Sequence, residues 1–107
     1  TTQGRCDEAE ALFNRSLAIK EEVLGPNHDE VATTLTNLVG LYFSQRQYEK
    51  AEPLQKRSLA ITEKTLGPNS PVALTNQKNY VALLRKLNRA KEAEQLEAQA
   101  KAAQRWQ

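Results

Sequence analysis

The chain has 107 residues and a net charge of +2, with 39% hydrophobic and 6% aromatic residues. This near-neutral charge gives no reason to expect nucleic acid or an anionic membrane as a partner. No apolar run approaches the roughly 20 residues of a membrane span. Cys6 is the single cysteine, which indicates a reduced thiol and a cytoplasmic location. No charged and apolar leader opens the chain, so no signal peptide is visible, and the absence of Met indicates a piece of a longer protein.

Residues 5–24 are predicted to form the first helix. Apolar side chains such as Leu12 and Ile19 recur there at helical spacing. The helix is expected to end at Gly25 and Pro26, because Gly tolerates the left-handed backbone after a helix and Pro cannot continue one.

Residues 30–45 are predicted to form the second helix, and one residue of 27–29 is expected to cap it. The buried stripe of this helix is expected to contain Val31, Leu35, Leu38, Val39 and Tyr42. The opposite face of this helix carries small and polar side chains and is therefore not expected to belong to the core.

The third helix, 48–66, is a copy of the first. Residues 7–27 and 49–69 share 13 identities in 21 aligned positions, at a spacing of 42 residues. Ser70 and Pro71 have the pattern of a helix start and open a fourth helix over 71–86. A fifth helix is predicted over 89–105. The chain is therefore a tandem array of helix pairs, treated as one unit over residues 1–107.

This array resembles the tetratricopeptide repeat. The residues that carry the resemblance are Leu38, Tyr42, Tyr48 and Ala51 in one unit and Ala9 and Phe13 in the previous one. The longer unit, with Ala-Glu-Pro-Leu at 51–54 and Leu-Gly-Pro-Asn-His at 24–28, is similar to the repeats of kinesin light chains. The resemblance implies an all-α fold: a right-handed α-solenoid of antiparallel helix pairs, with about five helices in two and a half repeats.

The resemblance also implies a binding groove. In this family the first helices of each pair line a concave groove that holds a peptide or a helix, and here those helices are 30–45 and 71–86. The residues implied to line it are Thr33, Thr36, Asn37, Gly40, Ser44, Thr75, Lys78, Asn79, Ala82 and Lys86. Asn37 and Asn79 match an Asn that hydrogen-bonds the ligand in peptide-binding relatives. Lys78 and Lys86 are suited to attract an acidic ligand.

The expected function is a non-catalytic scaffold for protein–protein interaction, with a protein or peptide partner and no cofactor. His28 is the only histidine and cannot build a metal site or a catalytic triad alone. The two Gly-Pro-Asn segments offer no run of free amides for a phosphate. We therefore expect no catalytic residues and no metal ligands.

The alternative is a structural or self-associating repeat element of a larger protein. The chain opens with the second helix of a pair, so the apolar side of helix 5–24 is expected to be poorly covered and to support a homo-oligomer. The last helix is expected to close the array, because Lys101 stands where the third helix has Leu59. Trp106 is expected to pack against this helix or to contact a partner.

Overall fold

The computed structural model describes residues 2–105, with side chains through residue 102, and the contacts expected of Trp106 lie outside this part of the chain. It contains five helices and no strand in the described residues. They are α1 (Thr2–Leu24), α2 (Asp29–Ser44), α3 (Tyr48–Leu66), α4 (Pro71–Lys86) and α5 (Ala90–Arg105). The predicted all-α, tetratricopeptide-like solenoid is confirmed.

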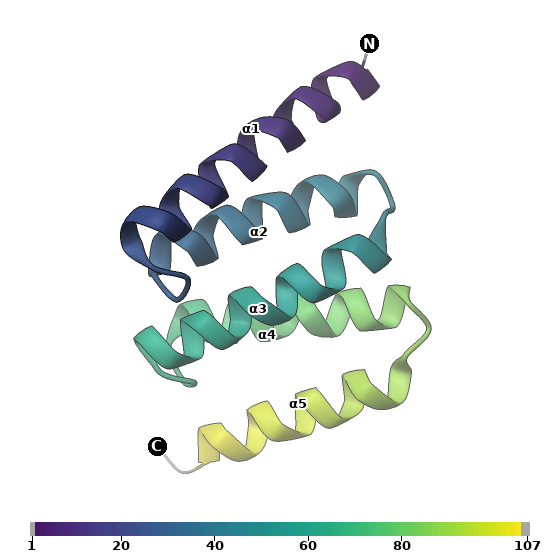
Figure 1. Cartoon of the computed structure of the whole chain (residues 1–107). Helices are drawn as coiled ribbons and strands as arrows, with labels where there is room; N and C mark the ends of the chain where they lie inside the picture. The colour runs from purple at the N-terminus through teal and green to yellow at the C-terminus, as the bar shows by residue number, and fades with distance from the viewer. Residues whose placement is uncertain (1, 106–107) are drawn as a thin grey trace.

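The helices form two layers, in which each helix packs against the one before it in the chain. In Figure 1, α1, α2, α3 and α5 follow one another from top to bottom, and α4 runs behind α3. The molecule measures 46 × 34 × 16 Å along its principal axes, so it is a thin slab. Helices α2 and α4 both pack against α3, and residues of the two helices line the same hollows.

Local signals in the sequence set the helix ends. Gly25 and Gly67 have φ values of 92° and 94°, a left-handed backbone that favours glycine. At the helix starts, His28 Nδ1 accepts a hydrogen bond from the Glu30 amide at 3.1 Å, and Ser70 Oγ accepts one from the Ala73 amide at 3.1 Å. The predicted Gly-Pro stops and the predicted cap at residues 27–29 are thus confirmed.

Ser70→Ala is expected to lower the free energy of unfolding by about 1 kcal/mol, because it removes the only side-chain partner of the Ala73 amide in the described structure. Ser44→Ala is the matched control. Ser44 is exposed and bonds only the Leu41 carbonyl of its own helix, so its loss should change stability by less than about 0.5 kcal/mol. Urea unfolding followed by circular dichroism measures both, and equal losses would contradict the assigned cap.

Two turns without glycine join the helices of each pair. Arg46 and Asn88 have φ values of 60° and 59° and lie 42 positions apart. The Gln47 amide donates to the Tyr42 carbonyl at 2.8 Å and the Arg89 amide to the Leu84 carbonyl at 2.9 Å. Both turns are Schellman motifs, which satisfy carbonyl groups at the ends of α2 and α4.

The core follows the predicted stripe of α2. All five of its members are buried, and Val31 and Leu35 pack with Ile61 of α3. Leu38 belongs to a second cluster that also contains Leu83 of α4. Val72, at the start of α4, lies outside the core and is half exposed.

A buried polar seam joins α3 to its neighbours. Gln55 Nε2 donates to Asn76 Oδ1 at 3.3 Å, and Asn76 Nδ2 donates to Thr62 Oγ1 at 3.1 Å. Ser58 Oγ donates to the Ala32 carbonyl at 3.2 Å and shares a 2.9 Å bond with Thr36 Oγ1. Buried polar groups are costly unless paired, so these bonds favour one register between helices.

Ion pairs on the outer layer connect successive units. Arg57 contacts Glu21 at 2.8 Å and the Pro26 carbonyl at 3.2 Å, which joins α3 to the end of α1. Arg89 contacts Glu52 of α3 at 2.6 Å. These pairs are partly exposed, so we assign them a smaller share of the stability than the core.

Candidate functional site: the trough between α2 and α4

Two hollows lie between α2 and α4. The first has a volume of 480 Å³ and extends from Asp29 to Asn79; we call it the Thr33 hollow. The second has a volume of 330 Å³ and contains Gly40; we call it the Gly40 hollow. Thr36 and Asn79 line both hollows. The two therefore form one continuous depression, here called the α2–α4 trough.

Eight of the ten residues expected in the groove line this trough. They are Thr33, Thr36, Asn37, Gly40, Ser44, Thr75, Asn79 and Ala82. The other two lie elsewhere. Lys78 lines a separate groove between α4 and α5, and Lys86 lines a shallow hollow beside the turns that follow α2 and α4.

The hydroxyl groups of the trough are already engaged with their own helices. Thr33 Oγ1 donates to the Asp29 carbonyl at 3.2 Å, and Thr75 Oγ1 donates to the Pro71 carbonyl at 2.9 Å. Ser44 Oγ donates to the Leu41 carbonyl at 2.7 Å. Their single donors are therefore used inside the protein, and the hydroxyl oxygens remain as acceptors.

The two exposed amide side chains of the trough differ from these hydroxyl groups. Asn37 and Asn79 are exposed, occupy equivalent positions 42 residues apart, and have no hydrogen-bond partner within the described part of the chain. Each amide carries two donors and one acceptor oxygen. Together they offer a pair of donor and acceptor groups along one trough, a pattern that suits the backbone of an extended peptide.

The trough is nearly neutral and has apolar ends. Among its lining residues only Asp29 is charged. Leu66 and Val72, both about half exposed, lie in the Thr33 hollow, and Phe43 lies in the Gly40 hollow. The sequence analysis did not assign these apolar residues to the groove. They lie near helix ends, where the spacing of apolar residues does not show which face of the helix a side chain is on.

The described helices include none that is both long and apolar enough to cross a membrane. The paired helices, the 42-residue period and the trough define a helical repeat protein. The chain belongs to the tetratricopeptide repeat family, whose sequence model matches residues 1–64 and again residues 30–105. A comparison with curated proteins found no match. Repeats of this family generally serve as modules for protein–protein interaction and are typically non-catalytic.

Proposed function

We propose that this chain is a scaffold that binds an extended peptide, or an extended segment of a protein, in the α2–α4 trough. The observation that carries the proposal is the pair of unpaired amides, Asn37 and Asn79, on equivalent positions of neighbouring first helices. A peptide backbone presents one N–H and one C=O per residue, and an Asn amide can bond both.

The lining indicates the kind of peptide. Because only Asp29 is charged in the trough, affinity should come from the backbone and from small or apolar side chains. Leu66 and Val72 are the apolar contacts at one end, and Phe43 at the other. Lys78 and Lys86 lie outside the trough, so we assign them at most long-range attraction of an acidic ligand. A cytoplasmic setting, where thiols stay reduced, suits the free Cys6.

The test begins with selection of random 12-residue peptides on the folded chain, followed by fluorescence polarisation with the selected peptide. Asn37→Ala and Asn79→Ala should each weaken binding about tenfold, because a hydrogen bond to an otherwise unpaired group contributes roughly 1 to 1.5 kcal/mol and 1.4 kcal/mol corresponds to tenfold. The double variant should lose more than either single variant.

Asn27→Ala is the matched control, since Asn27 is an exposed asparagine in the turn between α1 and α2 and lines neither hollow. Its affinity should equal that of the unaltered chain. Unchanged affinity in Asn37→Ala and Asn79→Ala, with peptides that do bind the chain, would reject the trough as the site.

A second candidate function, self-association, is favoured by the outer face of α1. Leu12, Ile19 and Val23 are 64%, 54% and 73% exposed. In α3 the equivalent positions of the first two are Leu54 and Ile61, which pack against α2. Sedimentation velocity over a range of concentrations tests this function, and a mass that stays monomeric throughout would reject it.

A further inference from the structure

The Thr33 hollow contains two apolar side chains that the core does not use. Leu66, at the end of α3, is 49% exposed, and Val72, in the first turn of α4, is 52% exposed. Neither is part of a hydrophobic cluster in the described structure, whereas Phe43 of the Gly40 hollow packs against one. The hollow is lined by α2, α3 and α4, each of which packs between two described helices, so it does not open at an end of the chain.

The internal repeat shows that the fold does not require an apolar residue at Val72. Positions of α2 and α4 correspond at a spacing of 42 residues: Val31 and Ala73 are both 0% exposed, and the turns after the two helices keep the same spacing. In this register Val72 stands where α2 has the exposed Glu30. Two half-exposed apolar residues gathered in one hollow are typical of a contact surface.

The polar groups of this hollow are largely bonded within the protein. Asn76 is bonded to Gln55 and Thr62, and the hydroxyl groups of Thr33 and Thr75 donate to carbonyl groups of their own helices. A polar ligand side chain in the hollow would give up its hydrogen bonds to water and find few groups to replace them. An apolar side chain gives up none, so the hollow favours an apolar occupant.

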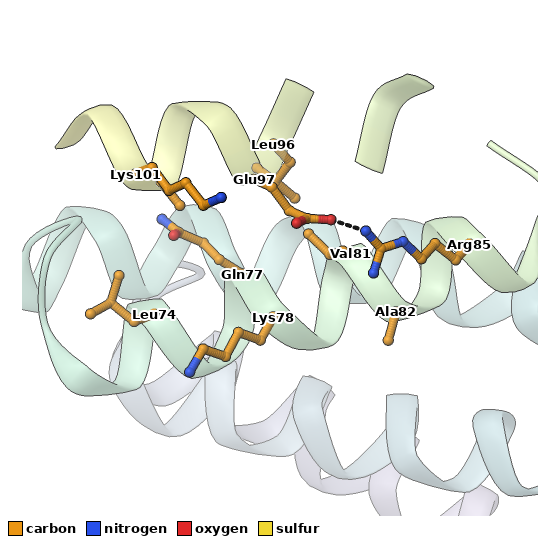
Figure 2. A pocket seen from close by; sticks show the side chains of 10 residues that line it. Leu74, Gln77, Lys78, Val81, Ala82, Arg85, Leu96, Glu97 and Lys101 are labelled. Atoms are coloured by element: carbon orange, nitrogen blue, oxygen red, sulfur yellow. Dashed lines mark hydrogen bonds and ion pairs between the residues drawn. The ribbon is translucent and has the colours of Figure 1, made fainter. Parts of the chain in front are cut away.

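A carboxylate without a partner lies at the same hollow. Asp29 is exposed, and its side chain forms no ion pair or hydrogen bond within the described part of the chain. Lys78, next to Asn79 on α4, lines the groove between α4 and α5, where Figure 2 shows Arg85 paired with Glu97. The trough therefore carries one negative charge that no cation of its lining balances.

The carboxylate and the apolar side chains lie at one end of the trough. Val72 corresponds to Glu30, the residue after Asp29, so Val72 and Asp29 are at nearly the same level on facing helices. Leu66 ends α3 and lines the same hollow. A ligand that fills the hollow with one side chain thus brings its neighbouring residues close to the carboxylate.

We propose that the α2–α4 trough binds a peptide that is both apolar and basic. One large apolar side chain inserts beside Leu66 and Val72 in the 480 Å³ Thr33 hollow, and a Lys or Arg within about two positions of it contacts Asp29. This inference rests on the proposed function and names the class of peptide. It reverses the preference for an acidic ligand that Lys78 and Lys86 suggest in the sequence.

The peptides selected on the folded chain give the first test. They should share a large apolar residue with Lys or Arg within about two positions of it. Fluorescence polarisation then compares each peptide with a copy in which Gln replaces the basic residue. The basic peptide should bind about threefold more tightly at low salt, the usual size of a partly exposed ion pair, and the preference should shrink as salt rises.

Asp29→Asn assigns this preference to one carboxylate. In this variant the two peptides should bind equally well, because the charge that distinguishes them is gone. Glu30→Gln is the matched control: both acids lie in the first turn of α2 and suit its dipole, but only Asp29 lines the hollow. The control should keep the threefold preference.

Leu66→Ser with Val72→Ser tests the apolar contact. This double variant should weaken binding about tenfold or more, because it removes most of the exposed apolar surface of the hollow. Leu24→Ser with Val23→Ser is the matched control, since it changes the same residue types at exposed positions of α1 that line no described hollow. All four positions are exposed, so both variants should fold, as circular dichroism can verify.

The failures of the two proposals can be told apart. If Asn37→Ala and Asn79→Ala leave the affinity unchanged, the proposed function falls and this inference falls with it. If both weaken binding but the double Ser variant binds as tightly as the unaltered chain, only the apolar–basic class is rejected. Acidic residues beside the apolar one in the selected peptides, or a preference that survives in Asp29→Asn, would also overturn it and leave the trough as the site.

Discussion

Leu35→Ala should lower the free energy of unfolding by about 2–5 kcal/mol, the largest stability effect that we expect from a single substitution in this chain. Leu35 is 0% exposed and packs with Val31, Ala32 and Ile61, where α2 meets α3. The substitution removes buried methyl groups and leaves a cavity between helices that can close only partly. Because domains of this size are typically stable by about 5–15 kcal/mol, the loss is a large fraction of the total.

Urea unfolding at a fixed protein concentration, followed by circular dichroism at 222 nm as is usual for helices, measures this loss. Leu66→Ala is the matched control, because Leu66 is the same residue type at the end of α3 and is 49% exposed. Its effect should stay below about 1 kcal/mol, since little apolar surface returns to water. Similar losses for both variants would mean that the contact between α2 and α3 is not the main core.

Asn76→Ala should lower the free energy of unfolding by about 1–3 kcal/mol, the usual cost of leaving buried polar groups without partners. Asn76 joins two side chains of α3: its Oδ1 accepts from Gln55 and its Nδ2 donates to Thr62. The substitution removes both side-chain bonds and leaves Gln55 Nε2, which is buried, only the backbone carbonyl of residue 76 at 3.5 Å.

A double-mutant cycle with Gln55→Ala isolates this contact. The two substitutions should couple by roughly 0.5–3 kcal/mol, because each removes the same hydrogen bond. Asn79→Ala is the matched control: this exposed Asn one turn further along α4 has no described partner, so its unfolding energy should change by less than about 0.5 kcal/mol. Additive losses for Gln55 and Asn76 would show that the seam does not hold α3 and α4 together.

The helices were predictable because their signals are local. Gly25 and Gly67 each precede a Pro, which marks the end of a helix, and Ser70 precedes Pro71, which marks the start of one. The internal repeat supports these predictions, because the pattern of the first helix occurs again 42 residues later in the third helix. The predicted ranges for the third and fourth helices agree with α3 and α4 at both ends.

Features without a local signal were missed. Arg46 and Asn88 adopt a left-handed backbone in the turns after α2 and α4; Asn tolerates this backbone, but Arg has no preference for it. Pro53, a residue type that disfavours the interior of a helix, lies inside α3, which begins at Tyr48 and continues through it. In both places the surrounding packing outweighs the preference of one residue.

The candidate site was only partly predictable. Carrying positions over from the family placed both Lys78 and Asn79 in the groove, but adjacent residues on a helix point about 100° apart, and Lys78 lines the separate groove between α4 and α5 instead. The resemblance could say which helices line the trough. It could not say how each helix is rotated, which decides the residues that a ligand meets.

The sequence by itself determined the class of protein, the number of helices and most of their ends, because repeats, helix stops and apolar periodicity depend on residues close together in the chain. Only the tertiary structure decided that Gln55 and Asn76 meet, that Asn37 and Asn79 share one trough, and that Lys78 lines a separate groove between α4 and α5. These features depend on how helices far apart in sequence are rotated and spaced, and that is set by the packing of the whole array.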